Sequence, residues 1–231
     1  MDSNEFKRWH SQHGQTLFCP GIPGAGKTIL TSIVIDYLCK RYGDDPRTGI
    51  AYVYCNFRHQ HVKKSEDLLA NILKQLLQKQ EFVPENIKAL YRQRRQQSTH
   101  LSLEEISKSL QHVFRQLSRS FVIIDALDEC QLSDRGRTRF LSHIFDLQKQ
   151  GQINIFVTSR CIPKIEKEFE GSTKLIVRAS DEDVHRYLDE KMPSLQGFVV
   201  GNLDLQQRIK TEITRAVDGM YVLFLIQMYI I

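Results

Sequence analysis

The sequence predicts an α/β fold, in which helices cover both faces of a parallel β-sheet. Short apolar, β-branched runs alternate along the chain with segments whose apolar residues recur every three or four positions. The run at 120–125 contains no polar alternation, which is typical of a strand buried on both faces. Because strands that alternate with helices pair in parallel through helical crossovers, these two observations favour a three-layer α/β sandwich.

Each element follows from its local pattern. Strands are predicted at 16–19, 49–57, 120–125, 153–159 and 173–179. Helices are predicted at 27–42, 65–80, 84–97, 102–119, 137–150 and 163–171. After residue 179 the pattern is helical only. We therefore expect an N-terminal helical segment at 1–14, a sheet domain at 15–179, and a helical subdomain at 180–231 that the chain end truncates.

Composition excludes several classes of protein. The 231 residues carry a net charge of +5, which suits an anionic ligand but is too small to indicate nucleic acid. The densest basic cluster, at 92–95, is interpreted as a solvated helix face. The five cysteines are dispersed without metal-site spacing, which indicates reduced thiols and a cytoplasmic location. The apolar segment 220–231 is too short to span a membrane and is expected to be a core helix.

The stretch GIPGAGKT, at 21–28, has the spacing of a phosphate-binding loop. It follows an apolar strand and opens an amphipathic helix, as such a loop must. Glycines let backbone N–H groups surround a phosphate, the helix directs its positive end at the anion, and the lysine and threonine serve the outer phosphates and Mg²⁺. A simple glycine-rich turn would explain the glycines but not the lysine and threonine together. The residues expected to bind nucleotide are Gly21, Ile22, Pro23, Gly24, Ala25, Gly26, Lys27, Thr28 and Ile29, with Thr28 also a metal ligand.

Three acids cluster in FVIIDALDEC, at 121–130. Asp125 ends the apolar strand, and we expect it to hold Mg²⁺ together with Thr28, as an acid at the tip of a neighbouring strand. Asp128 and Glu129 lie just beyond the tip, where a second acid can activate the attacking water. Asp128 is the first candidate and Glu129 the second. The alternative for one of them is a cap on the following helix.

Arg160 ends the next strand, in IFVTSR at 155–160. Ligands bind at the carboxyl ends of strands in open parallel sheets, so Arg160 is a candidate sensor of the terminal phosphate. The residues alone leave open whether it is a surface arginine in a loop.

Together GIPGAGKT, FVIIDALDEC, IFVTSR and VDGMYVLFLIQM resemble the NACHT-type NTPases of the STAND class, which are P-loop NTPases. The likeness is greatest to the nephrocystin-like modules of fungal NLR-like proteins, which ankyrin or other repeats often follow. The small residue after the first acid, Ala126, followed by two further acids, carries most of this resemblance.

The resemblance implies a signalling switch that binds Mg-ATP or Mg-GTP, hydrolyses it slowly and forms homo-oligomers when activated. It implies repeat or effector domains in a longer parent protein. From the small net charge and the short apolar segment, we expect neither nucleic-acid nor membrane binding. It assigns Arg160 as the sensor arginine and places residues 218–221 near the nucleotide. Trp9 is expected to pack against the edge of the sheet.

The sequence is compatible with other functions. A module that binds nucleotide without hydrolysing it is the main alternative. A small-molecule kinase on the same scaffold is disfavoured because no arginine-rich lid segment is evident. A transporter ATPase is disfavoured because no LSGGQ-like signature is present.

Overall fold

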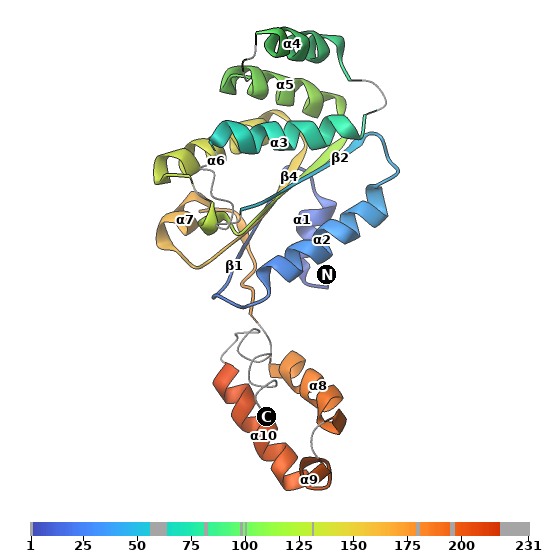
Figure 1. The fold of residues 1–231 in the computed structure, drawn as a ribbon, viewed down its shortest axis with the longest axis vertical. Coiled ribbons are helices and arrows are strands. Elements are labelled where there is room, and N and C mark those ends of the chain that lie inside the picture. The colour runs from blue at the N-terminus through green and yellow to red at the C-terminus, as the bar shows by residue number, and fades with distance from the viewer. Residues whose placement is uncertain are drawn as a thin grey trace.

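The computed structural model describes residues 2–55, 64–80, 83–97, 99, 101–130, 132–178, 181–194 and 197–217. Within these residues five parallel strands form one sheet with helices on both faces, which confirms the predicted fold class (Figure 1). The strands are β1 (Thr16–Pro20), β2 (Thr48–Tyr54), β3 (Arg119–Asp125), β4 (Ile153–Ser159) and β5 (Thr173–Lys174).

The strands lie in the order β2-β3-β4-β1-β5. β4 is therefore inserted between the first strand and the acidic strand β3. The register pairs Cys19 with Thr158 and Pro20 with Ser159, so β1 and β4 end together. Because all pairs are parallel, the carboxyl ends of β1, β3 and β4 meet at one edge of the sheet.

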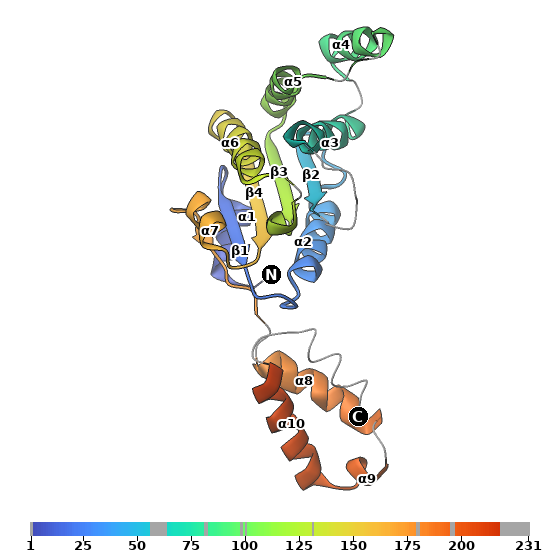
Figure 2. The same ribbon diagram turned by 60° about the vertical axis from the view of Figure 1, so that its left-hand side comes forward.

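Helices form a layer on each face of the sheet, as Figure 2 shows. One layer contains α1 (Asn4–Ser11) and α2 (Lys27–Tyr42). The other contains α3 (Ser65–Gln78), α5 (Leu103–Gln116) and α6 (Asp134–Gln150), with α4 (Glu85–Gln96) outermost. The 3₁₀ turn η1 (Leu127–Glu129) follows β3, and α7 (Pro163–Glu168) follows β4.

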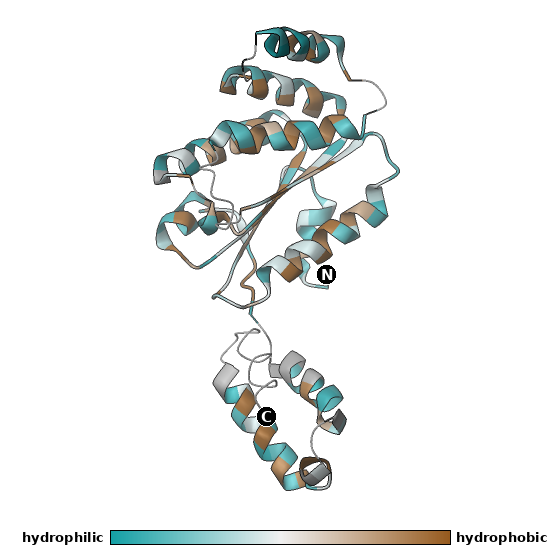
Figure 3. Cartoon of the chain, in the orientation of Figure 1, coloured by the Kyte–Doolittle hydropathy of each residue, from teal (hydrophilic) through white to brown (hydrophobic). Residues whose placement is uncertain are grey.

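Strand β3 contributes side chains to the hydrophobic core on each face of the sheet. Phe121 and Ile123 pack in the cluster beneath α1 and α2, and Val122 and Ile124 pack in the cluster beneath α3, α5 and α6. All four side chains are fully buried, which confirms the prediction of a strand covered on both faces. The strands are accordingly apolar in Figure 3. The acid that ends β3 is thus held on a rigid element.

The N-terminal helix α1 is fixed beneath the sheet rather than at its edge. Trp9 is 1% exposed, and its indole Nε1–H donates to the backbone oxygen of Ile155 at 2.9 Å. Its ring lies against Phe121 and Phe156, on the two central strands β3 and β4. The expectation of packing at the sheet edge was wrong, because the order of the strands places β4 inside the sheet.

Two strands are shorter than predicted. β5 contains only Thr173 and Lys174, and the chain beyond it keeps a single bridge between Val177 and Gly21. β2 ends at Tyr54, and residues 56–63 lie outside the described ranges.

Residues 181–217 are helical where they are described. They form α8 (Asp181–Lys191), η2 (Met192–Ser194), α9 (Gly197–Val200) and α10 (Leu203–Val217). Leu188, Val199 and Ile213 are buried in this segment. The predicted boundary at 179 and the predicted motif at 218–221 both fall outside the described residues. In the part of the chain that is described, no helix is both long and apolar enough to cross a membrane.

Candidate functional site

The loop between β1 and α2 adopts a conformation that needs glycine at three positions. Gly24 and Gly26 have positive φ angles of 74° and 85°, which side chains rarely adopt. A Cβ atom on Gly21 would lie 2.4 Å from the carbonyl oxygen of Val177. The positions of the glycines in this motif therefore follow from the backbone conformation of the loop.

The N-terminus of α2 faces this loop without a side-chain cap. Its N-cap residue is Gly26, which has no side chain to accept from the first-turn amides. Helix N-termini of this kind bind anions, because free N–H groups and the helix dipole act together. The side chains of Ile22 and Ile29, which were included among the predicted loop contacts, are 36% and 56% exposed. Any part they have in phosphate binding would therefore come from the backbone.

Backbone carbonyl groups of the loop hold the side chain of Lys27 in place. Its ammonium donates to the carbonyl oxygens of Gly21 and Ile22, both at 2.8 Å. Since an ammonium has three protons, one remains for another acceptor. Burial lowers the pKa of Lys27 below its usual range, and the carboxylates of Asp128 and Asp125 oppose this shift.

Asp125 is the centre of the site. It is 3% exposed, and three hydroxyl groups lie at hydrogen-bond distance from its carboxylate. Thr28 donates to Oδ2 at 2.8 Å, and Thr158 donates to Oδ1 at 2.7 Å. Thr31 reaches Oδ1 at 2.7 Å and the backbone oxygen of Lys27 at 3.0 Å, so its single proton serves one of them at a time. The predicted metal pair, Thr28 and Asp125, is thus in direct contact.

The order of the strands explains why Thr158 is present. Asp125 was expected on a strand next to β1, but β4 lies between them. Thr158, which is fully buried on β4, bridges this gap by accepting from the N–H of Ala126 at 2.9 Å and donating to Asp125.

Ala126 turns the chain away from β3. Its φ of 52° is the one positive value at a non-glycine position among the described residues. A β-branched or bulky residue would be strained in this left-handed conformation, which gives a backbone reason for the small side chain. The turn leads into η1, anchored by the fully buried Leu127.

Asp128 and Arg160, predicted separately, meet at this edge of the sheet. The backbone N–H of Arg160 donates to Oδ1 of Asp128 at 2.9 Å, and its guanidinium Nε donates to Oδ2 at 2.5 Å. The side chain of Asp128 is 1% exposed, whereas that of Arg160 is 50% exposed. Arg160 therefore engages both oxygens of the candidate base, one through its backbone N–H and the other through a guanidinium that solvent can reach.

Glu129 differs from Asp128 in this respect. Its backbone N–H donates to the oxygen of Ala126 at 2.8 Å, which closes η1. Its carboxylate forms no hydrogen bond or ion pair with any described residue, and the residue is partly exposed. Besides Asp125, the site thus contains two acids, one held by an arginine and one without a side-chain partner among the described residues.

The oxygen donors at this edge fit Mg²⁺. A threonine hydroxyl and an aspartate carboxylate already in contact are ligands of the kind that Mg²⁺ takes beside substrate phosphates. The uncapped helix N-terminus and the third proton of Lys27 supply donors for the phosphates themselves. The residues present are therefore suited to a metal–nucleotide complex.

Two residues of the site had no predicted role. Thr31 and Thr158 hold Asp125, and a weak signal existed for each. Thr158 is a hydroxyl in an otherwise apolar strand end, and Thr31 lies one helical turn after Thr28. Neither pattern identifies its partner without the order of the strands.

Solved structures with a similar fold are ATPases and replication initiators. A Walker-type ATPase of Pyrococcus abyssi is 15% identical, with a TM-score of 0.56 over 94% of this chain and 62% of that one. Drosophila ORC bound to DNA is 16% identical, with a TM-score of 0.55 over 94% and 49%. Domain III of the Thermotoga maritima replication initiation protein DnaA is 13% identical, with a TM-score of 0.50 over 95% and 76%. The chain thus spans less than two thirds of the first two, and these likenesses establish a P-loop ATPase fold.

The family follows from the sequence match. Residues 1–160 match the family described as Nephrocystin 3, N-terminal, and the chain belongs to it. The predicted likeness to nephrocystin modules is confirmed, whereas membership of the NACHT and STAND groups stays a prediction. A comparison with curated proteins found no match.

Removing the hydroxyl of Thr158 tests its role in this arrangement. Thr158→Val keeps the side-chain shape but removes one of the three hydroxyl partners of Asp125 and the acceptor of the Ala126 N–H. We expect the free energy of unfolding, measured by urea denaturation, to fall by about 1–3 kcal/mol. Thr158→Ser should retain most of it.

The matched control is Thr138→Val, which removes an exposed hydroxyl that donates to Glu168 at 2.8 Å. That change should stay within about 0.5 kcal/mol. Equal effects of the two valine substitutions would contradict the role given to Thr158.

Proposed function

We propose that this chain is a nucleotide-operated switch that binds Mg-ATP or Mg-GTP, hydrolyses it slowly and couples nucleotide state to conformation and self-assembly. The hydrogen bond between Thr28 and Asp125 is the observation that supports this most. It joins the phosphate loop to the acidic strand at one point, although the two residues are 97 positions apart in sequence.

Binding would use the backbone of the loop, the first turn of α2 and the ammonium of Lys27. To bind a phosphate, Lys27 needs only its third proton, or the exchange of one carbonyl for a phosphate oxygen. Thr28 and Asp125 would hold Mg²⁺, which when bound neutralises charge on the phosphates. Asp125 is already positioned for this by its hydroxyl partners.

Hydrolysis would require a base near the terminal phosphate. We assign this role first to Asp128, which would accept a proton from water while the water oxygen bonds to the γ-phosphorus and the bond to the leaving oxygen breaks. Asp128 must first lose its guanidinium partner. A γ-phosphate would draw the half-exposed Arg160 away, so that the same group senses the nucleotide and frees the base.

This competition between Asp128 and a phosphate for Arg160 would give the switch its two states. With Arg160 on Asp128, the base is neutralised and turnover is slow. When Arg160 binds the phosphate instead, its contact with Asp128, which joins the end of β4 to η1, is replaced by a contact with the nucleotide. The loss of that contact would change the position of η1 and so affect α6, which begins at Asp134. Self-assembly and the repeat or effector domains of a longer protein would respond to this change.

The second candidate is a module that binds nucleotide but does not hydrolyse it. The engagement of both Asp128 oxygens by Arg160 favours it, because a carboxylate in that state is a poor base. The two functions share the binding site and differ only in turnover.

Loss of the loop lysine should remove binding. Lys27→Ala deletes a charged donor, and we expect affinity for ATP and GTP in the presence of Mg²⁺ to fall about 10- to 100-fold by isothermal titration calorimetry. Lys40→Ala is the matched control, because Lys40 lies on the same helix and is 76% exposed. Unchanged affinity in Lys27→Ala would refute the phosphate-loop assignment.

Turnover separates the two acids and the two functions. Asp128→Asn should keep nucleotide binding and lose about 100-fold or more of the phosphate-release rate, as removal of a general base does. Glu129→Gln should stay close to the wild-type rate. The reverse pattern would transfer the role of base to Glu129. No phosphate release by the wild-type chain, with binding intact, would support the non-hydrolysing module.

A further inference from the structure

A groove of about 730 Å³ lies far from the phosphate loop, where α4 meets α3 and the start of α5. None of its residues belongs to the nucleotide site. Its lining comes from three segments. The first is α3 with its N-cap, the second is α4, and the third is the segment that leads into α5 with the first turn of that helix. The lining residues are, in that order, Lys64, Glu66, Asp67 and Ala70; Tyr91, Arg94 and Arg95; and Thr99, Leu101, Ser102, Leu103 and Ile106.

The helix α4 that forms one wall is barely packed. It lies at the outer end of the sheet domain in Figures 1 and 2 and is hydrophilic along its length in Figure 3. Ile87 is its one buried residue, and Tyr91 is 63% exposed. A helix of 12 residues is marginal in water on its own, so the outer face of α4 is a surface that a partner would stabilise.

The charge of α4 is basic and partly uncompensated. Lys88 pairs with Glu85 at 2.8 Å within the helix. Arg94 donates to Glu105 of α5 at 2.6 Å, which holds α4 in place and, with the Ser102 backbone N–H, lowers the pKa of Glu105 to about 2. Arg92 and Arg95 are exposed and form no hydrogen bond or ion pair with the described residues.

The facing wall carries two acids, Glu66 and Asp67, beside the cation Lys64, and both acids are engaged. Asp67 accepts from the backbone N–H of Lys64 at 2.9 Å, and Glu66 accepts from the Ser65 hydroxyl at 2.9 Å. The groove is therefore polarised: Arg95, with the paired Arg94, lines its α4 wall, and the satisfied acids Glu66 and Asp67 line its α3 wall. A ligand with its negative charge on one edge would fit it in one orientation.

The floor between the walls is apolar. Ile106 is 2% exposed, and Ala70, Leu101 and Leu103 are partly buried against the same core. An apolar side chain could lie on this floor while its neighbours reach the walls. Tyr91, beside the free arginines, adds the residue types that most often anchor protein interfaces.

We propose that this groove and the outer face of α4 bind an amphipathic, acidic segment of a partner protein. Its apolar side chains would cover the partly buried Leu101 and Leu103, and its carboxylates would pair with Arg95 in the groove and with the exposed Arg92 outside it. Complementary charge would set the orientation and speed the encounter.

A nucleic acid suits this groove less well. A phosphate backbone carries charge on every unit and would meet Glu66 and Asp67 on the opposite wall. The groove also has one exposed aromatic residue rather than a row of stacking platforms.

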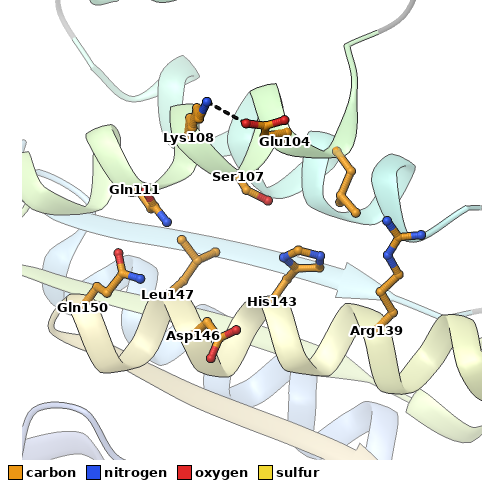
Figure 4. Close-up of a pocket in the computed structure, with 10 residues that line it drawn as sticks. Glu104, Ser107, Lys108, Gln111, Arg139, His143, Asp146, Leu147 and Gln150 are labelled. Atoms are coloured by element: carbon orange, nitrogen blue, oxygen red, sulfur yellow. Dashed lines mark ion pairs between the residues drawn. The ribbon is translucent and has the colours of Figure 1, made fainter.

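A second groove, of about 490 Å³ between α5 and α6, shows the contrast (Figure 4). Its charges are mixed, and Lys108 pairs with Glu104 at 2.7 Å, as the dashed line marks. Asp146, on the other wall, pairs with Lys149 at 3.1 Å. Such a surface offers no net attraction for an acidic segment.

Fluorescence anisotropy with three labelled probes tests the proposal on the full chain. The probes are a 14-residue helical peptide with a Leu face and a Glu face, the same peptide with Gln in place of Glu, and a 20-nucleotide poly(dT). We expect the Glu peptide to bind, with affinity that falls as salt rises, and the other two to bind at least about tenfold more weakly.

Charge reversal then locates the contact. Arg92→Glu/Arg95→Glu should weaken the Glu peptide about tenfold or more, and Tyr91→Ala severalfold. Lys7→Glu/Arg8→Glu on α1 is the matched control, since it changes net charge equally at two exposed residues and should have less than about a twofold effect. Circular dichroism would establish that each variant keeps its helices.

The proposal would be overturned by no binding of the Glu peptide, by equal loss in the α1 and α4 double variants, or by preference for poly(dT). Equal binding of the Gln peptide would also overturn it, because charge would then have no part.

Discussion

The buried carboxylate of Asp125 is the group on which the site depends. A buried charge is costly unless donors surround it, and here the donors are the hydroxyls of Thr28, Thr31 and Thr158. They come from the first turns of α2 and the end of β4. One side chain therefore ties together the phosphate loop, the acidic strand and the strand between them.

This arrangement explains why the functional residues lie where they do. Because β4 separates β1 from β3, the gap at the strand ends is closed by Thr158 and, one layer further out, by the pair of Arg160 and Asp128. The inner contact is buried and fixes Asp125, one of the two proposed metal ligands. The outer contact is half-exposed and can be exchanged. A nucleotide switch requires both kinds of contact. The rigid inner contacts hold the binding site in place before nucleotide binds, and the outer contacts can be exchanged when it does.

Much of this could be predicted from sequence, for physical reasons. The phosphate loop is recognisable because its backbone conformations require glycine at fixed positions. Strand β3 is recognisable because it is an apolar run that ends in Asp125. The contacts of Asp125 with Thr158 and of Asp128 with Arg160 could not be predicted, because they depend on strand order, which local periodicity does not encode. The same cause misplaced Trp9, whose hydrogen bond to β4 is visible only once β4 is known to be central. The length of β5 was overestimated because an apolar run does not reveal how many of its residues find a partner strand.

The most direct test of the central claim is the Mg²⁺ dependence of nucleotide affinity in the wild-type chain and in Asp125→Asn. The amide keeps the size of the carboxylate but is a poorer ligand for a hard cation. We predict that Mg²⁺ tightens nucleotide binding about tenfold or more in the wild type and has little effect in the variant, while affinity without metal stays similar in both. An equal Mg²⁺ effect in both proteins would contradict the role of Asp125 as the link between the phosphate loop and the acidic strand.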